Sequence, residues 1–221
     1  LLLMPWLVAA TLSVFRWPWL AAPQGERFTP YRCGLQTVYF SVLGLWWLFV
    51  LFLSGDSAPL PWLPLLNPLE LAQLAVLALA VRWLWSEQSP AWLQRLRLFL
   101  LSAGGFLMVT FTTLRAVHHW GNVDWGSSML STSLAQTSLT LVWSVLGVLG
   151  WVIGSRRGNR GLWLAGAVLM GVVLVKLILV DRGNLGDAWG IGSFIAYGLL
   201  CTLVGYFAPA PPRNATQENA A

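Results

Sequence analysis

Long apolar runs separated by short polar loops make up most of the chain. Seven such runs lie at about 1–15, 36–54, 69–86, 97–114, 134–153, 162–180 and 189–208. Runs of this length with few charges are typical of transmembrane helices, because a helix needs about 20 apolar residues to cross a bilayer. No run alternates between apolar and polar positions as the strands of a transmembrane barrel do. The pattern therefore predicts an all-α fold, a polytopic transmembrane helical bundle of about seven helices.

The two ends of the chain complete this division. Residues 1–208 form the predicted transmembrane helical domain, and residues 209–221 are polar and begin with proline, which predicts a disordered tail. The first apolar run is a few residues short of a full span, and the chain begins with Leu1 rather than methionine. We therefore expect the chain to be the C-terminal part of a larger membrane protein whose preceding helices are its partners.

The amino-acid composition indicates that most of the chain is surrounded by lipid. The chain is 57% hydrophobic and 10% charged, whereas about 25% of the residues in a soluble domain are charged, so its surface must face a lipid bilayer. The net charge of +5 is spread over several loops and forms no single basic face, which excludes nucleic acid as a partner. Tryptophans near the ends of the runs are expected to anchor the helices at the membrane interface: Trp17, Trp19, Trp62, Trp83, Trp85, Trp92, Trp120, Trp125 and Trp189.

The arginines alternate between the predicted loops. Ten of them fall on one side of the membrane, and two, Arg115 and Arg182, fall on the other. Because basic residues are enriched in cytoplasmic loops, the C-terminus and the tail are predicted to be cytoplasmic. The proline-rich loop after the run 36–54 then lies outside, where we expect it to cap the bundle.

Glycines predict which helices are in contact. They recur along two successive runs, where the absence of a side chain lets helix backbones approach closely in lipid. The runs 134–153 and 162–180 are therefore expected to pack together through Gly147, Gly150, Gly154, Gly161, Gly166 and Gly171.

Lys176 is the only lysine in the chain and interrupts the run 162–180. Three interpretations stay open: an ammonium that reaches the headgroup region, a buried structural ion pair, and a functional site. Glu70 is the preferred partner because the predicted topology puts it at the same outer end of the bundle. Asp181 is second, because five positions along a helix turn its side chain about 140° away.

A second polar cluster follows the run 97–114. Arg115, His118, His119 and Asp124 lie at the predicted outer face, as an interfacial turn, a binding or proton-handling site, or a metal site. Adjacent histidines on a helix diverge by about 100°, and no zinc-type spacing is present, so we expect neither metal nor cofactor. No complete catalytic set is recognisable either, which leaves the catalytic residues unknown and disfavours an enzyme.

Three stretches between about 110 and 208 carry a resemblance. They read LRAVHHW, SLTLVWSVLGVLGWVIGSRRGNRGLWLAGAVLMGVVLVKLILVD and SFIAYGLLCTLVGYFAP. They resemble the C-terminal end of a family of very large bacterial predicted membrane proteins, domain of unknown function 2339. The matching residues are Trp143, Lys176, Asp181, Ser193, Phe194, Ile195 and Gly198, while Gly190 stands where the family often has arginine.

The resemblance implies that many more helices precede these seven and that Lys176 belongs to the family pattern. It supplies no reaction. We expect a multi-pass protein of the bacterial inner membrane, and three kinds of function remain open. The first is a transport- or channel-like module, the second an enzyme acting on a lipid-linked envelope substrate at the periplasmic face, and the third a structural scaffold for envelope proteins.

Overall fold

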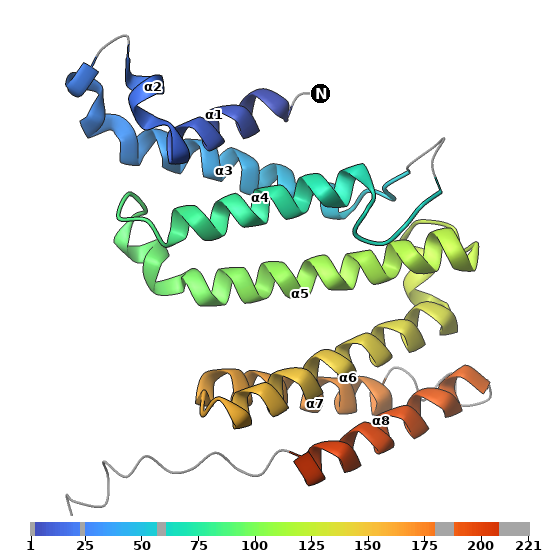
Figure 1. The fold of residues 1–221 in the computed structure, drawn as a ribbon. Coiled ribbons are helices and arrows are strands. Elements are labelled where there is room, and N and C mark those ends of the chain that lie inside the picture. The colour runs from blue at the N-terminus through green and yellow to red at the C-terminus, as the bar shows by residue number, and fades with distance from the viewer. Residues whose placement is uncertain (1–2, 23–24, 57–60, 180–187, 208–221) are drawn as a thin grey trace, which may run out of the picture. The chain divides into compact units, whose positions relative to one another are not determined.

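The chain is helical in the computed structural model, which describes residues 3–22, 25–56, 61–179 and 188–207 (Figure 1). These residues form eight α-helices and two 3₁₀-helices and contain no strand. The chain divides into two compact units, residues 1–115 and 116–221. The predicted tail 209–221 lies outside the described residues.

The first unit contains α1 (Met4–Phe15), α2 (Trp17–Ala21), η1 (Gly25–Tyr31), α3 (Arg32–Leu51), α4 (Pro68–Leu84) and most of α5 (Ala91–Gly121). Its core joins α1, α3, α4 and α5 through buried apolar side chains, among them Leu43 and Val76. Phe40 of α3 and Trp83 of α4 stack in parallel, with ring centroids 4.3 Å apart. Aromatic stacking and close apolar packing thus hold the three longest helices of this unit.

The second unit contains the end of α5, η2 (Ser127–Ser131), α6 (Ser133–Arg156), α7 (Arg160–Leu179) and α8 (Ala188–Phe207). The helices α6 and α7 form a tightly packed hairpin, and α8 packs against α6. The hairpin turns at Gly158, whose positive φ of 62° suits glycine. Asn159 then caps the start of α7 by accepting a hydrogen bond from the backbone of Leu162 at 3.1 Å.

The predicted contact between the runs 134–153 and 162–180 is confirmed. A Cβ added to Gly166 would overlap the backbone of Trp151, and one added to Gly154 would overlap the backbone of Trp163. Gly150 also lies against Gly166, at 3.4 Å from an added Cβ to the Cα of Gly166. Gly171 has nothing within 4 Å, so the glycine pattern marks the right pair of helices but not every contact.

Each of the seven predicted runs coincides with one helix. By length and hydropathy, four helical segments of the described residues are suited to cross a membrane: Arg27–Leu51, Ala91–Gly121, Ser133–Arg156 and Arg160–Leu179. The helix α1 is apolar but has only 12 residues. The helical membrane bundle is therefore confirmed, whereas the count of seven spans is not.

Exposed apolar side chains cover the described helices. Leu45 and Phe49 of α3 and Leu98 and Phe99 of α5 are each 67–69% exposed, as lipid-facing side chains are. Seven of the nine tryptophans predicted as interface anchors divide into two groups, while Trp125 is half-buried and the side chain of Trp189 lies outside the part that the structure describes. Trp19, Trp85, Trp92 and Trp120 are exposed, but Trp17, Trp62 and Trp83 are buried, because they pack within the first unit instead.

Candidate functional site

Arg115 is the largest fully buried side chain of the described residues. The sequence placed it in a loop, but α5 continues to Gly121 and carries it as part of the helix. Its guanidinium reaches the end of α3, where the last backbone carbonyls of a helix have no partner within the helix. The carbonyls of Val50, Leu51 and Leu53 accept hydrogen bonds from it at 2.9, 3.3 and 3.0 Å.

The remaining donors of Arg115 bind α4. Its Nη1 donates to Glu70 Oε1 at 3.3 Å and to Gln73 Oε1 at 3.0 Å. A guanidinium has five N–H groups, so these two acceptors and the three carbonyls match its full capacity. Glu70 and Gln73, like Arg115, are 0% exposed. We call these groups, with Thr112, the Arg115 cluster.

Glu70 is held from three sides. Its Oε1 accepts hydrogen bonds from Arg115 and from Thr112 Oγ1, the latter at 3.2 Å, and its Oε2 accepts one from the backbone N–H of Leu65 at 2.5 Å. The position in the first turn of α4 also favours a carboxylate, because the N-terminus of a helix carries partial positive charge. A buried ion pair is stable only when its remaining hydrogen-bonding positions are filled, and here Oε1 and Oε2 are both filled.

The loop before α4 is shaped around the same cluster. Asn67 caps α4 by accepting a hydrogen bond from the backbone of Leu69 at 2.9 Å, and its amide donates to the carbonyl of Gly55. Gly55 has a positive φ of 75°, and an added Cβ would lie 3.4 Å from Arg115 Cδ. The backbone conformation and the close approach both require glycine here. Gly55 and Asn67 therefore lie together beside Arg115, between the end of α3 and the start of α4.

The cluster lies near one end of α5. This helix has 31 residues, about 46 Å, so it exceeds the roughly 30 Å hydrocarbon core of a bilayer. Arg115 precedes the last residue of α5 by six positions, or about 9 Å. With α5 centred in the bilayer, the cluster lies at the edge of the hydrocarbon layer and not at its midplane.

One of the three interpretations of Lys176 was an ion pair with Glu70 as the preferred partner, but in the structure the cation beside Glu70 is Arg115. Lys176 instead binds α6 within the second unit. Its Nζ donates to the backbone oxygen of Gln136 at 3.1 Å and to Thr140 Oγ1 at 2.6 Å. The side chain is half-buried, so the ammonium is drawn onto a neighbouring helix. Asp181, the second partner predicted, lies outside the described residues.

His118 and His119 lie next to each other in the last turn of α5. Adjacent helical positions were expected to separate them, yet their rings meet at an angle, with centroids 4.7 Å apart. His118 Nδ1 lies 2.6 Å from the carbonyl of Val123, which can only accept, so Nδ1 carries the hydrogen and Nε2 keeps a lone pair in the neutral ring. The ring of His118 also contacts Trp125 at 5.9 Å. Asp124 is exposed. The group that the second unit forms here therefore consists of His118, His119 and the indole of Trp125.

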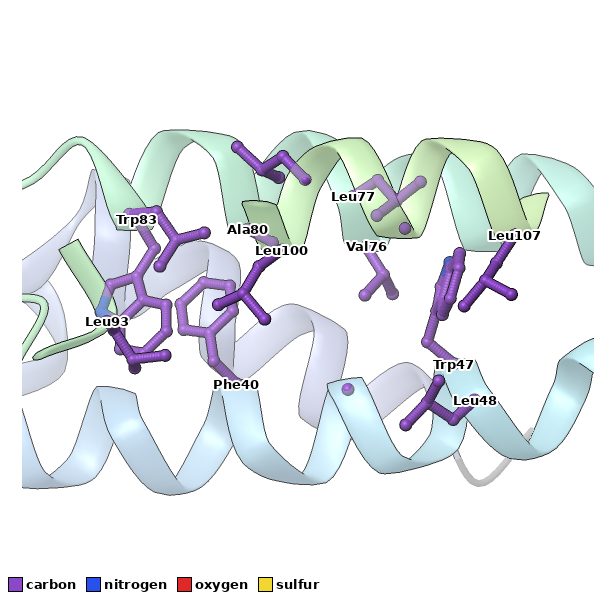
Figure 2. A pocket seen from close by; sticks show the side chains of 14 residues that line it. Phe40, Trp47, Leu48, Val76, Leu77, Ala80, Trp83, Leu93, Leu100 and Leu107 are labelled. Carbon is purple, nitrogen blue, oxygen red and sulfur yellow. The ribbon is translucent and has the colours of Figure 1, made fainter. Parts of the chain in front are cut away.

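Two grooves of the first unit are lined by apolar side chains. One, here called the α3–α5 groove, has a volume of about 280 Å³ and is formed by α3, α4 and α5 (Figure 2). The other has a volume of about 780 Å³, with Leu7 of α1, Trp46 of α3 and Leu71 of α4 among its lining residues. Both grooves suit hydrocarbon better than a hydrated solute.

Sequence reasoning missed the polar residues that complete these sites: Asn67, Gln73, Thr112, Gln136 and Thr140. One signal was available for two of them. Gln73 follows Glu70 by three positions, which puts both on one face of a helix, and Asn67-Pro68 is a typical helix start. Nothing comparable marks Thr112, Gln136 or Thr140, because hydroxyl and amide groups are common in transmembrane helices.

Comparisons with known proteins give one result. The family described as predicted membrane protein (DUF2339) matches residues 1–211, which includes the first unit with the Arg115 cluster and all of the second unit except its last ten residues. Searches of curated proteins and of solved structures give no match. The resemblance seen in the last third of the sequence thus extends over nearly the whole chain. The chain belongs to the DUF2339 family of predicted membrane proteins, whose function is unknown.

Proposed function

We propose that the chain is a structural scaffold module that organises helices and partner proteins in the bacterial inner membrane. One observation carries the proposal: the five donors of Arg115 all bind acceptors of the chain itself, four in the helices α3 and α4 and one at Leu53 just after α3. Such a cluster joins helix ends and leaves its cation no free donor for a passing solute. The second apolar groove of the first unit, lined by Leu7, Trp46 and Leu71, supports the same function, because it suits an apolar partner.

A transport- or channel-like role is the second candidate, and one group favours it. Gln73 Nε2 is buried and has no acceptor among the described residues. A buried donor beside an intramembrane ion pair is typical of a site that meets a substrate oxygen. The position of the cluster at the edge of the hydrocarbon layer is less typical, since the sites of transporters lie near the midplane.

Flux measurements separate these two functions. The full-length protein is reconstituted into lipid vesicles loaded with dyes that report protons or potassium, beside protein-free vesicles. A scaffold gives the same leak as protein-free vesicles. Glu70→Gln, which keeps the side-chain volume but replaces one acceptor oxygen of Glu70 with a donor, leaves that leak unchanged. Flux that the wild type supports and Glu70→Gln removes, with both proteins eluting as folded species, contradicts the scaffold and establishes transport.

Photocrosslinking in cells tests the scaffold directly. A photoreactive amino acid replaces Leu45 or Leu98, each 69% exposed, and buried Leu43 in the same helix as Leu45 serves as the control. We expect adducts with other polypeptides at the exposed positions and none at Leu43. Adducts with lipid alone at both exposed positions contradict a scaffold.

The proposed orientation has its own test. The distribution of arginines predicts that the turn between α6 and α7 is cytoplasmic and that η2 is periplasmic. In a background with Cys33 and Cys201 replaced by serine, Ser128→Cys should react with an impermeant thiol reagent added to cells with an opened outer membrane. Asn159→Cys should react only after lysis, and the reverse pattern would invert the topology.

A further inference from the structure

The α3–α5 groove has an apolar lining supplied by three helices. Figure 2 shows Phe40, Trp83 and Leu93 at one end, Trp47 and Leu107 at the other, and small or branched apolar side chains between them. Trp47 and Trp83 are each 5% exposed. The groove is therefore a shaped recess in the first unit and differs from the exposed apolar surface of its outer faces.

Glycines give the groove its depth. A Cβ added to Gly44, which lines the groove on α3, would meet no heavy atom within 4 Å. A Cβ added to Gly104, which lines it on α5, would touch Leu77 at 3.4 Å, an ordinary contact. The space beside Gly44 is therefore large enough for hydrocarbon from another molecule.

The length of the groove fits an acyl chain. Its lining residues on α5 extend from Leu93 to Leu107, which is about 21 Å along the helix axis. One leaflet of the hydrocarbon core is about 15 Å deep. A recess that follows a transmembrane helix over this distance lies parallel to the acyl chains of the bilayer.

One end of the groove is basic. Arg82 lies in the last turn of α4, and Arg95 and Arg97 lie in the first turns of α5, with Glu87 as the acid between these helices. Arg97 follows Leu93 by four positions and precedes Leu100 by three, so it shares the helix face that lines the groove. Its guanidinium lies over the ring of Trp85, 4.9 Å from the centroid. Arginines beside an apolar recess at a membrane surface suit a lipid phosphate.

The indole of Trp83 adds a donor at the same end. Its Nε1 is buried and has no acceptor among the described residues. Trp83 is the penultimate residue of α4, which is the depth at which the ester carbonyls of a glycerolipid lie when the arginines meet its phosphate. An ester carbonyl can accept the hydrogen bond that the indole offers.

We propose that the α3–α5 groove binds an anionic glycerophospholipid. One acyl chain lies in the groove beside Gly44, an ester carbonyl faces Trp83, and the phosphate faces Arg97. This lipid site goes beyond the scaffold function and stands independently of it, since the groove can hold lipid whether or not the chain binds partner proteins.

Photolabelling tests the site. The full-length protein is illuminated with phosphatidylglycerol that carries a diazirine in its acyl chain, and labelled peptides are mapped by mass spectrometry. Label is expected on the groove faces of α4 and α5, with competition by unlabelled phosphatidylglycerol and much weaker competition by phosphatidylcholine. Arg97→Gln should weaken the competition by about tenfold, the loss expected for one charge-assisted hydrogen bond.

Matched glycine variants provide the control. Gly44→Leu fills the groove and should remove most of the label. Gly44→Ala should be labelled to an extent between those of Gly44→Leu and the wild type. Gly105→Leu places the same side chain on α5, where an added Cβ also meets nothing within 4 Å and which does not line the groove, so its labelling should equal that of the wild type. Thermal unfolding and size-exclusion chromatography verify that each variant is folded.

Three results would overturn the proposal. The first is labelling of the groove that Gly44→Leu leaves unchanged, and the second is equal competition by phosphatidylcholine. The third is a crosslink from the groove to another helix of the full-length protein in place of lipid label. None of these results depends on flux or on partner crosslinking, so the failure of the lipid site is distinguishable from the failure of the scaffold function.

Discussion

The two units hold their helices together in different ways. In the first unit, a buried arginine joins the end of α3 to α4 through five hydrogen bonds. In the second unit, α6 and α7 meet backbone to backbone at Gly154 and Gly166. Lipid chains are as apolar as leucine, so the hydrophobic effect gives helices in a bilayer little reason to associate. Both units use polar bonding and van der Waals contact, but the largest polar cluster lies in the first unit and the closest backbone contact lies in the second.

The difference matters for what each unit tolerates. A polar cluster depends on every member, because the loss of one leaves buried groups without partners. A glycine contact depends on the absence of atoms, so the smallest addition damages it. The two units should therefore respond to opposite kinds of substitution, removal of a group in the first and addition of one in the second.

The largest expected effect is at Arg115. Arg115→Met leaves the Glu70 carboxylate without its cation and the carbonyls of Leu51 and Leu53 without the guanidinium donors, which should destabilise the protein by about 3–5 kcal/mol. Thermal unfolding of the purified full-length protein measures the loss. Arg82→Met, at an exposed position in the last turn of α4, is the matched control and should change little. Equal stability of the two variants would mean that the cluster does not hold the first unit together.

An intermediate effect is expected at the glycine contact. Gly166→Ala adds one methyl group that overlaps the backbone of Trp151, and such overpacking costs about 1–3 kcal/mol. Gly171→Ala adds the same group to the same helix where nothing lies within 4 Å, so it should be neutral. A comparison of the two unfolding midpoints checks this. If both variants have the same unfolding midpoint, the backbone contact is not what joins α6 to α7.

The smallest effect is expected at Lys176. Its ammonium is half-buried and bonded to Gln136 and Thr140, so Lys176→Met should cost about 1.5 kcal/mol, the lower end of the range for hydrogen bonds of a charged group because the site is only half-buried. Thr140→Val removes the hydroxyl that accepts one of these bonds. If the bond contributes to stability, the double variant loses less than the sum of the single variants. Additive losses would show that Lys176 acts through other groups.

The sequence predicts the helices and the glycine contact because both depend on local pattern. Apolar runs define the helices, and the spacing of Gly147, Gly150 and Gly154 defines a face. The Arg115 cluster is different, since it joins residues 42 to 65 positions apart in sequence. Half of the acceptor atoms in the cluster are backbone carbonyls. Every residue has such a carbonyl, so no pattern of side chains predicts which ones accept.

The error at Glu70 has a physical reason. The predicted topology put Glu70 and Arg115 at the same outer end of the bundle, but Arg115 was assigned to the loop that follows the run 97–114. The structure extends α5 to Gly121, which draws Arg115 into the helix and makes it the nearer cation. Boundaries of helices that end in polar residues are poorly defined by hydropathy, and here about two extra turns change which groups are paired.

The coupling between Arg115 and Glu70 tests the account most directly. Unfolding free energies are measured for the wild type, Arg115→Met, Glu70→Met and the double variant. A structural cluster predicts that the double variant is destabilised by less than the two single variants together, with a coupling of about 2 kcal/mol, because no unpaired buried charge remains. Losses that simply add would contradict the account, since Arg115 and Glu70 would then contribute to the first unit independently.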